Sequence, residues 1–326
     1  MRTSETSVPA DPDEVVFSVV IPVYTNEATL GDVIERLTDV GSRLPGRLEA
    51  VFVVDGSPDG SLAVLERLLP DAAIASQLVV HSRNFGSFPA IRTGMAVARG
   101  RYVGVMAADL QEPPELMEQF FTVLASGAAD ITVGRRESRA DPVMSSLLSR
   151  SFWGLYRRVI NPSIPRGGVD VFGCTREVAQ HLLSLNEAHS SLVGLLYWVG
   201  FRRVEIPYSR VERTSGRSGW TFRKRVRYLL DSVFSFTDIP ISILSTVGIT
   251  GSLLTLVASV VVLVSWLTGH ITEVGYTPLM LVLLFSTFTL LSGLGVVGSY
   301  VWRAYENSKG RPVSVPMSRV TFDVDR

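Results

Sequence analysis

The sequence is poor in cysteine and has no excess of charge of either sign. Its 326 residues contain one cysteine, so an intramolecular disulfide is excluded and the chain fits a reducing compartment. Basic and acidic side chains balance to a formal net charge of zero. Without a global positive field, no nucleic-acid partner is expected. Residues 1–14 are polar and acidic and lack a signal-peptide pattern, so we expect a disordered N-terminal tail.

Charge is also missing from two long stretches near the C-terminus. No Asp, Glu, Lys or Arg occurs from Ile239 to Thr272 or from Val274 to Trp302. About 20 apolar residues suffice to cross a bilayer, so we expect transmembrane helices at 239–268 and 277–302. The alternative is a buried helical hairpin in a large core.

Basic residues flank this pair of stretches on both outer sides. Arg223, Lys224, Arg225 and Arg227 precede it, and Arg303, Lys309 and Arg311 follow it, whereas the connecting loop has no Lys or Arg. The positive-inside rule then places the N-terminal region and both termini in the cytoplasm and the loop outside. The expected location is the plasma (inner) membrane, with two spans and a cytoplasmic C-terminal tail at 303–326.

Residues 220–237 carry apolar side chains at helical spacing with basic residues between them. A basic amphipathic helix directly before a span is expected to lie on the membrane surface. A helix packed on the globular domain is the alternative.

Strand and helix patterns alternate through residues 15–219. Near-continuous apolar runs at 16–22, 49–54, 77–81, 101–107 and 130–133 are typical of strands buried on both faces, and helical patterns lie between them. The fold class predicted is α/β, a Rossmann-like domain with a mostly parallel sheet. The strands end in polar or charged residues, namely Glu27, Asp55, Arg83, Asp109 and Arg135. Because such ends share one edge of a parallel sheet, we expect them to converge on one cleft.

Asp109 stands out among these strand ends. It follows an apolar run, and Gln111, Glu112 and two prolines come after it. A carboxylate with an amide two residues on suits a hard cation such as Mg²⁺. A surface acid that caps the next helix is the alternative. A cation together with arginines indicates phosphate-bearing ligands, and a membrane at the edge of the cleft indicates that one of them is a lipid.

Four segments occur in an order that resembles a known family: Val19–Glu27, Val54–Asp59, Ser82–Gly86 and Ala108–Pro114. Together they resemble the inverting family 2 glycosyltransferases of GT-A fold. With the Arg-rich segment Glu212–Trp220 and two spans, the chain is similar to the polyprenyl-phosphate branch, which includes dolichol-phosphate mannose synthase and bacterial undecaprenyl-phosphate glucosyltransferases. The resemblance implies sugar transfer from a nucleotide-sugar to a polyprenyl phosphate, for cell-envelope glycan modification.

The resemblance also assigns roles to individual residues. Nucleotide-sugar contacts fall on Pro22, Tyr24, Glu27, Asp55, Arg83, Asn84, Asp109 and Gln111. Acceptor-phosphate contacts fall on Arg135, Arg213, Arg217 and Ser218. Mg²⁺ or Mn²⁺ is expected on Asp109 and Gln111, and catalytic roles on Asp109, Asp170, Arg213 and Arg217. His81 and His189 are expected to be structural.

The chain departs from the family pattern at two positions. Ala107 and Val54 stand where the family commonly has acids, so one metal carboxylate is missing. A catalytically impaired, membrane-anchored scaffold that binds nucleotide-sugar is therefore an alternative, as is a transferase acting on a non-lipid acceptor. The resemblance favours a UDP-sugar such as UDP-glucose, with guanine and thymine carriers left open, and is compatible with a homo-oligomer.

Overall fold

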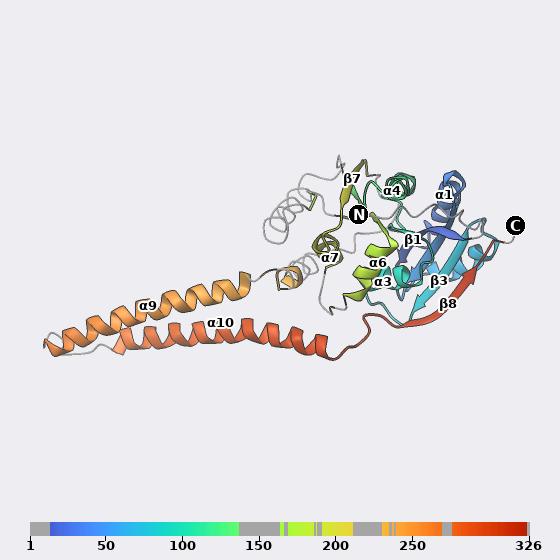
Figure 1. The fold of residues 1–326 in the computed structure, drawn as a ribbon. Helices are drawn as coiled ribbons and strands as arrows, with labels where there is room; N and C mark the ends of the chain where they lie inside the picture. The colour runs from blue at the N-terminus through green and yellow to red at the C-terminus, as the bar shows by residue number, and fades with distance from the viewer. Residues whose placement is uncertain are drawn as a thin grey trace. The chain divides into compact units, whose positions relative to one another are not determined.

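The computed structural model describes residues 14–136, 164–165, 169–185, 187, 191–210, 230–234, 237, 239–268 and 276–324. They fall into two compact units. The first contains an α/β sheet domain, and the second contains two long helices (Figure 1).

The first unit is built on one sheet of eight strands, in the order β7-β5-β6-β4-β1-β2-β3-β8. The strands are β1 (Val15–Val23), β2 (Arg47–Val54), β3 (Ala75–His81), β4 (Tyr102–Val105), β5 (Ile131–Arg136), β6 (Phe172–Thr175), β7 (Arg203–Tyr208) and β8 (Pro316–Phe322). β1 pairs in parallel with β2 and β4, and β2 with β3, while β6 and β8 run antiparallel to their neighbours. The prediction of a mostly parallel α/β sheet is confirmed.

Helices cover both faces of this sheet. They are α1 (Leu30–Arg43), α2 (Ser61–Leu68), the 3-10 turn η1 (Leu69–Asp71), α3 (Ser87–Val97), α4 (Leu116–Ala125), α6 (Arg176–Ser184) and α7 (Leu192–Trp198). Apolar residues of α1 at helical spacing are buried with α2, α4 and alternate residues of β1 and β2. The other face of these strands meets α3, where a Cβ on Gly94 would lie 2.2 Å from Val20. Glycine is therefore what lets α3 approach β1 closely.

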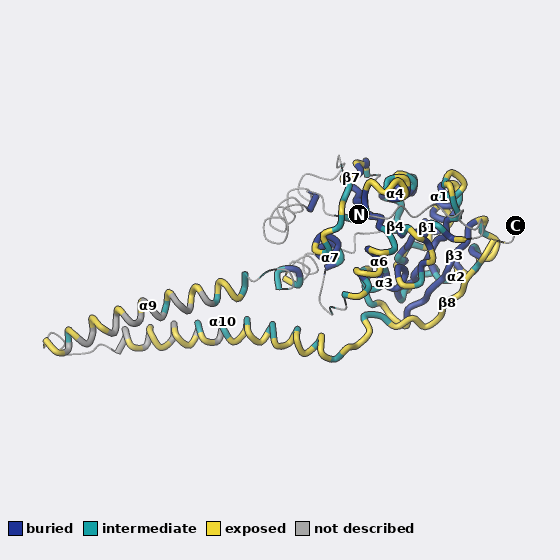
Figure 2. Tube along the Cα trace, in the orientation of Figure 1, coloured by how far each residue is buried: buried dark blue, intermediate teal, exposed yellow. Residues whose placement is uncertain are grey.

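The C-terminal segment is a strand of this sheet. The sequence predicts a tail for residues 303–326, but the helix α10 continues to Ser308 and β8 pairs antiparallel with β3. β8 is an edge strand whose residues are largely exposed, in contrast to the buried central strands (Figure 2). An exposed edge strand lacks the apolar run that marks a buried one, so the pattern alone did not reveal it.

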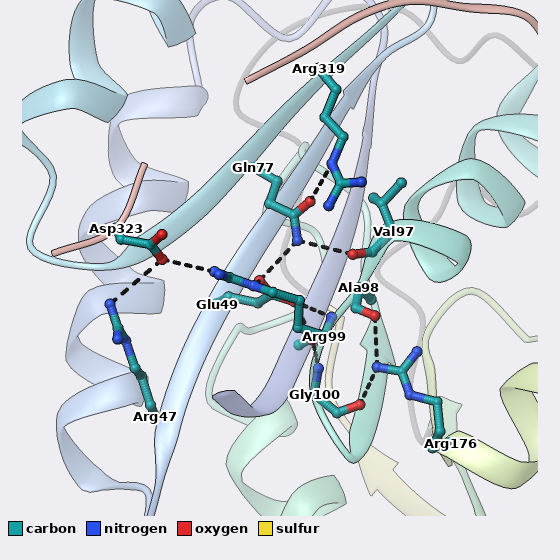
Figure 3. A network of polar contacts seen from close by, with 11 residues as sticks. Arg47, Glu49, Gln77, Val97, Ala98, Arg99, Gly100, Arg176, Arg319 and Asp323 are labelled. Carbon is teal, nitrogen blue, oxygen red and sulfur yellow. Dashed lines mark hydrogen bonds and ion pairs between the residues drawn. The ribbon is translucent and has the colours of Figure 1, made fainter. Parts of the chain in front are cut away.

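Side chains fasten the far end of β8 to the sheet through a group that we call the clamp, made of Glu49, Gln77, Arg99, Arg319 and Asp323 (Figure 3). Arg319 Nε donates to Gln77 Oε1 at 3.0 Å, and Arg99 pairs with Asp323 at 3.1 Å. Buried Glu49 accepts hydrogen bonds from Gln77 Nε2 and Arg99 Nε. A buried carboxylate with several donors is stable only when all of its partners stay in place.

The second unit contains α9 (Ile239–Leu267) and α10 (Tyr276–Ser308), which pack against each other. A Cβ on Gly293 of α10 would lie 3.2 Å from Leu244 of α9. Before α9, residues 230–234 are helical, and Asp231 there pairs with Arg303 of α10 at 2.8 Å. Across the described part of the chain, no helix combines the length and the apolar character that a membrane span requires. The interfacial helix at 220–237 lies largely outside the described residues, and it stays a prediction with the two spans.

Candidate active site

The loops after β1 and β2 are joined by hydrogen bonds at the carboxyl edge of the sheet. Thr25 N donates to Ser57 Oγ at 2.8 Å, and Glu27 N donates to Asp59 Oδ2 at 3.1 Å. In return Gly60 N, at the start of α2, donates to Glu27 Oε2 at 2.9 Å. Glu27 and Tyr24, which the resemblance assigned to the nucleotide, are exposed at this edge, and Pro22 is half-buried at the end of β1.

Hydrogen bonds also set the charge of Asp59. Burial raises the pKa of its carboxyl, but hydrogen bonds from Ser57, Ser61 and the Glu27 backbone outweigh burial and leave the pKa lowered. Asp59 is therefore a fixed anion that holds the two loops together.

Asp55 anchors the loop after β3, residues 82–86. Its carboxylate is 3 % exposed and accepts from Phe85 N at 2.9 Å and from Gly86 N at 2.7 Å. His81 Nδ1 lies 2.8 Å from Asp55 Oδ1. Gly56 has a φ of 60°, and a Cβ there would lie 2.4 Å from Asn84 N, so glycine is required where the two loops meet.

The loop held by Asp55 presents Arg83 and Asn84 to solvent. The Arg83 guanidinium lies 3.9 Å from the centre of the Phe85 ring and donates to Asn84 O at 3.1 Å. Both residues are thus available at the edge where the resemblance expects a nucleotide.

The segment after β4 turns sharply so that several polar groups share one place. Leu110 has a φ of 55°, an unfavourable value for a residue with a side chain, and it separates Asp109 from Gln111. Gln111 N donates to Asp109 Oδ1 at 3.3 Å. Glu112, one residue further, is 2 % exposed.

An arginine at the end of β5 and another just after β7 lie beside acidic residues here. Arg210 donates to Gln111 Oε1, and its Nε lies 3.4 Å from Glu112 Oε1. Arg136 pairs with Asp170, and its Nε donates to Tyr208 OH at 3.3 Å. Arg136 and Tyr208 face each other because β5 and β7 pair in that register. We call Asp109, Gln111, Glu112, Arg136, Asp170, Tyr208 and Arg210 the strand-end cluster.

Burial and neighbouring charge shift two pKa values in this cluster. Burial raises the pKa of Glu112, and the charge of Asp109 raises it further, against Arg210 and Arg136, which lower it. Burial likewise raises the pKa of Tyr208, followed by the charge of Glu112. A buried carboxyl whose pKa is shifted by burial and by specific charged neighbours is typical of a functional site.

The strand-end cluster supplies only part of the coordination shell of a divalent cation, so a bound phosphate ligand would supply further oxygen atoms. Within the described residues no three His, Cys, Asp or Glu side chains gather as a metal site. Asp109 and Gln111 supply a carboxylate and an amide oxygen, and buried Glu112 Oε1 accepts no hydrogen bond from the described part of the chain. Mg²⁺ commonly binds one or two carboxylates and completes its shell with water and substrate phosphates, so the donor set is compatible with such a cation.

The structure separates some residues that the sequence assigned to one site. Arg135 points to the face opposite Arg136 and pairs with Glu205 at 3.6 Å, because neighbouring strand residues face opposite sides. Arg213, Arg217, Ser218 and His189 lie outside the described residues. Glu112, Arg136, Tyr208 and Arg210 had no role in the sequence-based prediction. Arg210 follows the end of a strand, as the predicted residues do, and that position was the available signal.

The family model and the known proteins that match this chain are described as glycosyltransferases. Residues 18–182 match the model of the family described as "Glycosyl transferase family 2". The uncharacterized glycosyltransferase YkcC of Bacillus subtilis is 31% identical over 301 residues, 92% of each chain. The bactoprenol glucosyl transferase of Shigella phage SfV is 28% identical over 298 residues, 90% of this chain and 96% of that protein.

Solved structures show a weaker likeness. Glucosyl-3-phosphoglycerate synthase from Mycobacterium tuberculosis has a TM-score of 0.47 at 17% identity, over 68% of this chain and 80% of that one. Mannosyltransferase PcManGT from Pyrobaculum calidifontis, in complex with GDP-Man and Mn²⁺, has a TM-score of 0.44 at 16% identity, over 91% of this chain and 89% of that one.

Proposed function

Because the chain belongs to glycosyl transferase family 2, we propose that it transfers a sugar from a nucleotide-sugar to a polyprenyl phosphate, with inversion at the sugar. The observation that carries the proposal is the strand-end cluster, which joins acids to two arginines at the carboxyl edge of a largely parallel sheet. Ligands of open α/β sheets bind at this edge. The similarity to bactoprenol glucosyl transferases along nearly the whole chain supports a lipid acceptor.

The arginines supply charge where two phosphate ligands must meet. One guanidinium group can donate two parallel hydrogen bonds to a phosphate group. Asp170 holds Arg136 at this edge, and Glu112 holds Arg210. We therefore assign to Arg136 the phosphate contact that the resemblance placed on Arg135. Arg213, Arg217 and Ser218 follow Arg210 closely in the chain and stay the proposed contacts of the acceptor phosphate.

The acceptor needs little activation. A phosphate monoester has a second pKa of about 6, so at neutral pH it is already mostly a nucleophilic dianion. Its oxygen forms a bond to the anomeric carbon on the face opposite the nucleoside diphosphate, and the bond from that carbon to the diphosphate oxygen breaks. The positive groups stabilise the negative charge that develops on the departing diphosphate. Asp109 and Gln111 would hold Mg²⁺ or Mn²⁺, which neutralises charge on the departing diphosphate when bound.

The two-span topology is part of the proposal and rests on the sequence of α9 and α10. α9 has 29 residues, about 43 Å of helix, and a bilayer core measures about 30 Å. β8 follows α10 in the chain and pairs with β3, so the segment between the two parts of the sheet domain must return to the side where it started. Two crossings meet this requirement, and the basic residues that flank the pair of helices on both outer sides favour the cytoplasmic side for the sheet domain.

The test is transfer of radiolabelled sugar into a solvent-extractable lipid. Full-length protein is combined with polyprenyl phosphate, Mg²⁺ or Mn²⁺, and a panel of UDP-, GDP- and TDP-sugars. We expect one donor to yield a lipid product, and Arg210→Ala to lower the rate about a hundredfold. The matched control is Arg202→Ala, which removes an exposed arginine paired with Asp130.

Other outcomes point to other functions. Binding of the donor without any lipid product would favour the scaffold that Ala107 and Val54 suggest. Transfer to a protein or glycan but not to the lipid would identify a different acceptor. Equal rates for Arg210→Ala and Arg202→Ala would contradict the role given to the strand-end cluster.

A further inference from the structure

A chain of buried polar side chains leads from the anchor of the 82–86 loop to the segment between α10 and β8. His81 Nδ1 lies 2.8 Å from Asp55 Oδ1, and His81 Nε2 lies 2.9 Å from Thr93 Oγ1. Thr93 Oγ1 in turn lies 2.8 Å from Ser314 Oγ. Asp55, His81 and Thr93 are each less than a tenth exposed. We call these four residues the relay.

The relay is a continuous series of hydrogen-bond contacts between side chains. Asp55 Oδ1 accepts from Phe85 N and lies within hydrogen-bond distance of His81 Nδ1. An imidazole nitrogen and a hydroxyl can each donate or accept, so His81 Nε2, Thr93 and Ser314 can continue the series in either direction. A polar network in which every group has a partner fixes the orientation of each member.

The same segment also holds the other end of the loop through the backbone. Ser82 N donates to Val315 O at 3.0 Å. The 82–86 loop is thus fastened on one side by Asp55, through Phe85 N and Gly86 N, and on the other by residues 314–315. Between these fixed points it presents Arg83 and Asn84.

We infer that His81, Thr93 and Ser314 are positioning residues that hold Arg83 and Asn84 for the nucleotide of the donor, so the segment after α10 belongs to the donor site. The inference rests on the proposed function, because it takes a nucleoside diphosphate as the ligand of this loop. The sequence predicted a structural role for His81 and none for Thr93 or Ser314. The relay gives them a function because it connects directly to the Asp55 carboxylate that carries the loop.

The experiment measures binding of UDP, and of GDP as the alternative, to full-length protein by calorimetry, with the KM for the donor and kcat from the transfer assay. Thr93→Val keeps the shape of the side chain and removes the hydroxyl, whereas Thr93→Ser keeps the hydroxyl. We expect Thr93→Val and Ser314→Ala each to weaken nucleotide binding about fivefold, with kcat near the wild-type value. Thr93→Ser should bind as the wild type does.

Two further variants test whether the relay positions the 82–86 loop or whether any weakening of the attachment of β8 lowers nucleotide binding. Arg319→Ala removes the clamp contact with Gln77 in the middle of β8 and should leave nucleotide binding unchanged. The double variant Thr93→Val/Ser314→Ala should be no weaker than either single variant, because both break one chain. The inference would be overturned if Thr93→Val bound the nucleotide as tightly as the wild type, or if Arg319→Ala weakened nucleotide binding as much as Thr93→Val does. The proposed function would stand in either case. A wild-type protein that binds neither nucleotide would overturn the proposed function and the inference with it.

Discussion

Leu110 shows how one residue arranges the strand-end cluster. Its φ of 55° reverses the chain between Asp109 and Gln111, so that the backbone N–H of Gln111 donates to the Asp109 carboxylate. Non-glycine residues in this conformation store strain and recur at binding sites. In this protein the strained backbone lies at the position where the sequence predicts a cation and a diphosphate.

Asp109→Asn tests this position. We expect transfer to fall about a hundredfold or more, because Ala107 supplies no second carboxylate at the position where the family commonly has an acid. The measurement is the rate of lipid-linked sugar formation at saturating donor, over a range of Mg²⁺ and Mn²⁺ concentrations.

The matched control for Asp109→Asn is Asp130→Asn, which changes an acid paired with Arg202 away from the cluster. It should keep nearly full activity. If Asp109→Asn retained substantial transfer, Asp109 would have to be reassigned as a cap of the following turn.

Glu112 predicts a pH dependence of stability. Burial raises the pKa of its carboxyl in the folded protein, so the unfolded chain releases the proton at a lower pH than the folded one. The contribution of Glu112 to the free energy of unfolding is therefore largest where its carboxyl is protonated, and it falls as pH rises through the interval between the unfolded and the raised folded pKa. Glu112→Gln has no such proton to lose.

The free energy of unfolding of Glu112→Gln, relative to that of the wild type, should accordingly increase from about pH 4.5 upward. The increase should end where the wild-type Glu112 carboxyl is ionised in both the folded and the unfolded protein. Denaturant unfolding of the full-length protein at several pH values measures it. Asp59 and Glu115, whose pKa values are lowered, titrate alike in both proteins and cancel. A difference that is independent of pH would contradict the raised pKa.

At the scale of elements, β6 buries the single cysteine in the middle of the sheet. Cys174 is fully buried, and burial raises the pKa of its thiol to about 12. Since thiolate is the reactive form, we expect no labelling by a thiol reagent while the sheet is folded. Labelling should begin only as denaturant unfolds the domain, which makes Cys174 a reporter for every variant above.

An exposed cysteine provides the comparison. Ser126→Cys lies on the surface at the end of α4 and should react at once under native conditions. Prompt labelling of Cys174 itself in the native protein would show that β6 opens easily and is less firmly packed than its burial indicates.

The elements differ in how visible they are in the sequence. Strands buried on both faces, such as β1 and β2, appear as apolar runs and were predicted within a few residues. β6 and β8 are short or exposed and run antiparallel, and their positions depend on pairing with β4 and β3. Local pattern carries no information about such long-range pairing, because the partner is distant in the chain.

At the scale of the whole molecule, the return of β8 to the sheet domain predicts a topology. In a Cys174→Ala background, Thr272→Cys should react with a membrane-impermeant maleimide added to intact cells, because the loop between α9 and α10 is proposed to lie outside. Ser308→Cys, at the end of α10, should stay unlabelled until the cells are broken.

Two results would decide against this arrangement. Labelling of Ser308→Cys in intact cells would place the end of α10 outside and separate it from β3. If neither cysteine were labelled in intact cells, the loop between α9 and α10 would not be external, and the two helices would form a hairpin that does not cross the membrane. Recovery of labelling after lysis controls for reagent access.

The sequence by itself determined the α/β class, the strand ends that carry polar groups, and the family, because buried runs and short motifs are local properties of the chain. Only the tertiary structure decided which polar groups meet. Strand register placed Arg136, not Arg135, with Asp170 and Tyr208, and the pairing of β8 with β3 brought Ser314 to Thr93. Side-chain direction along a strand and the closure of a sheet over hundreds of residues are set by packing, so they emerge only in the folded chain.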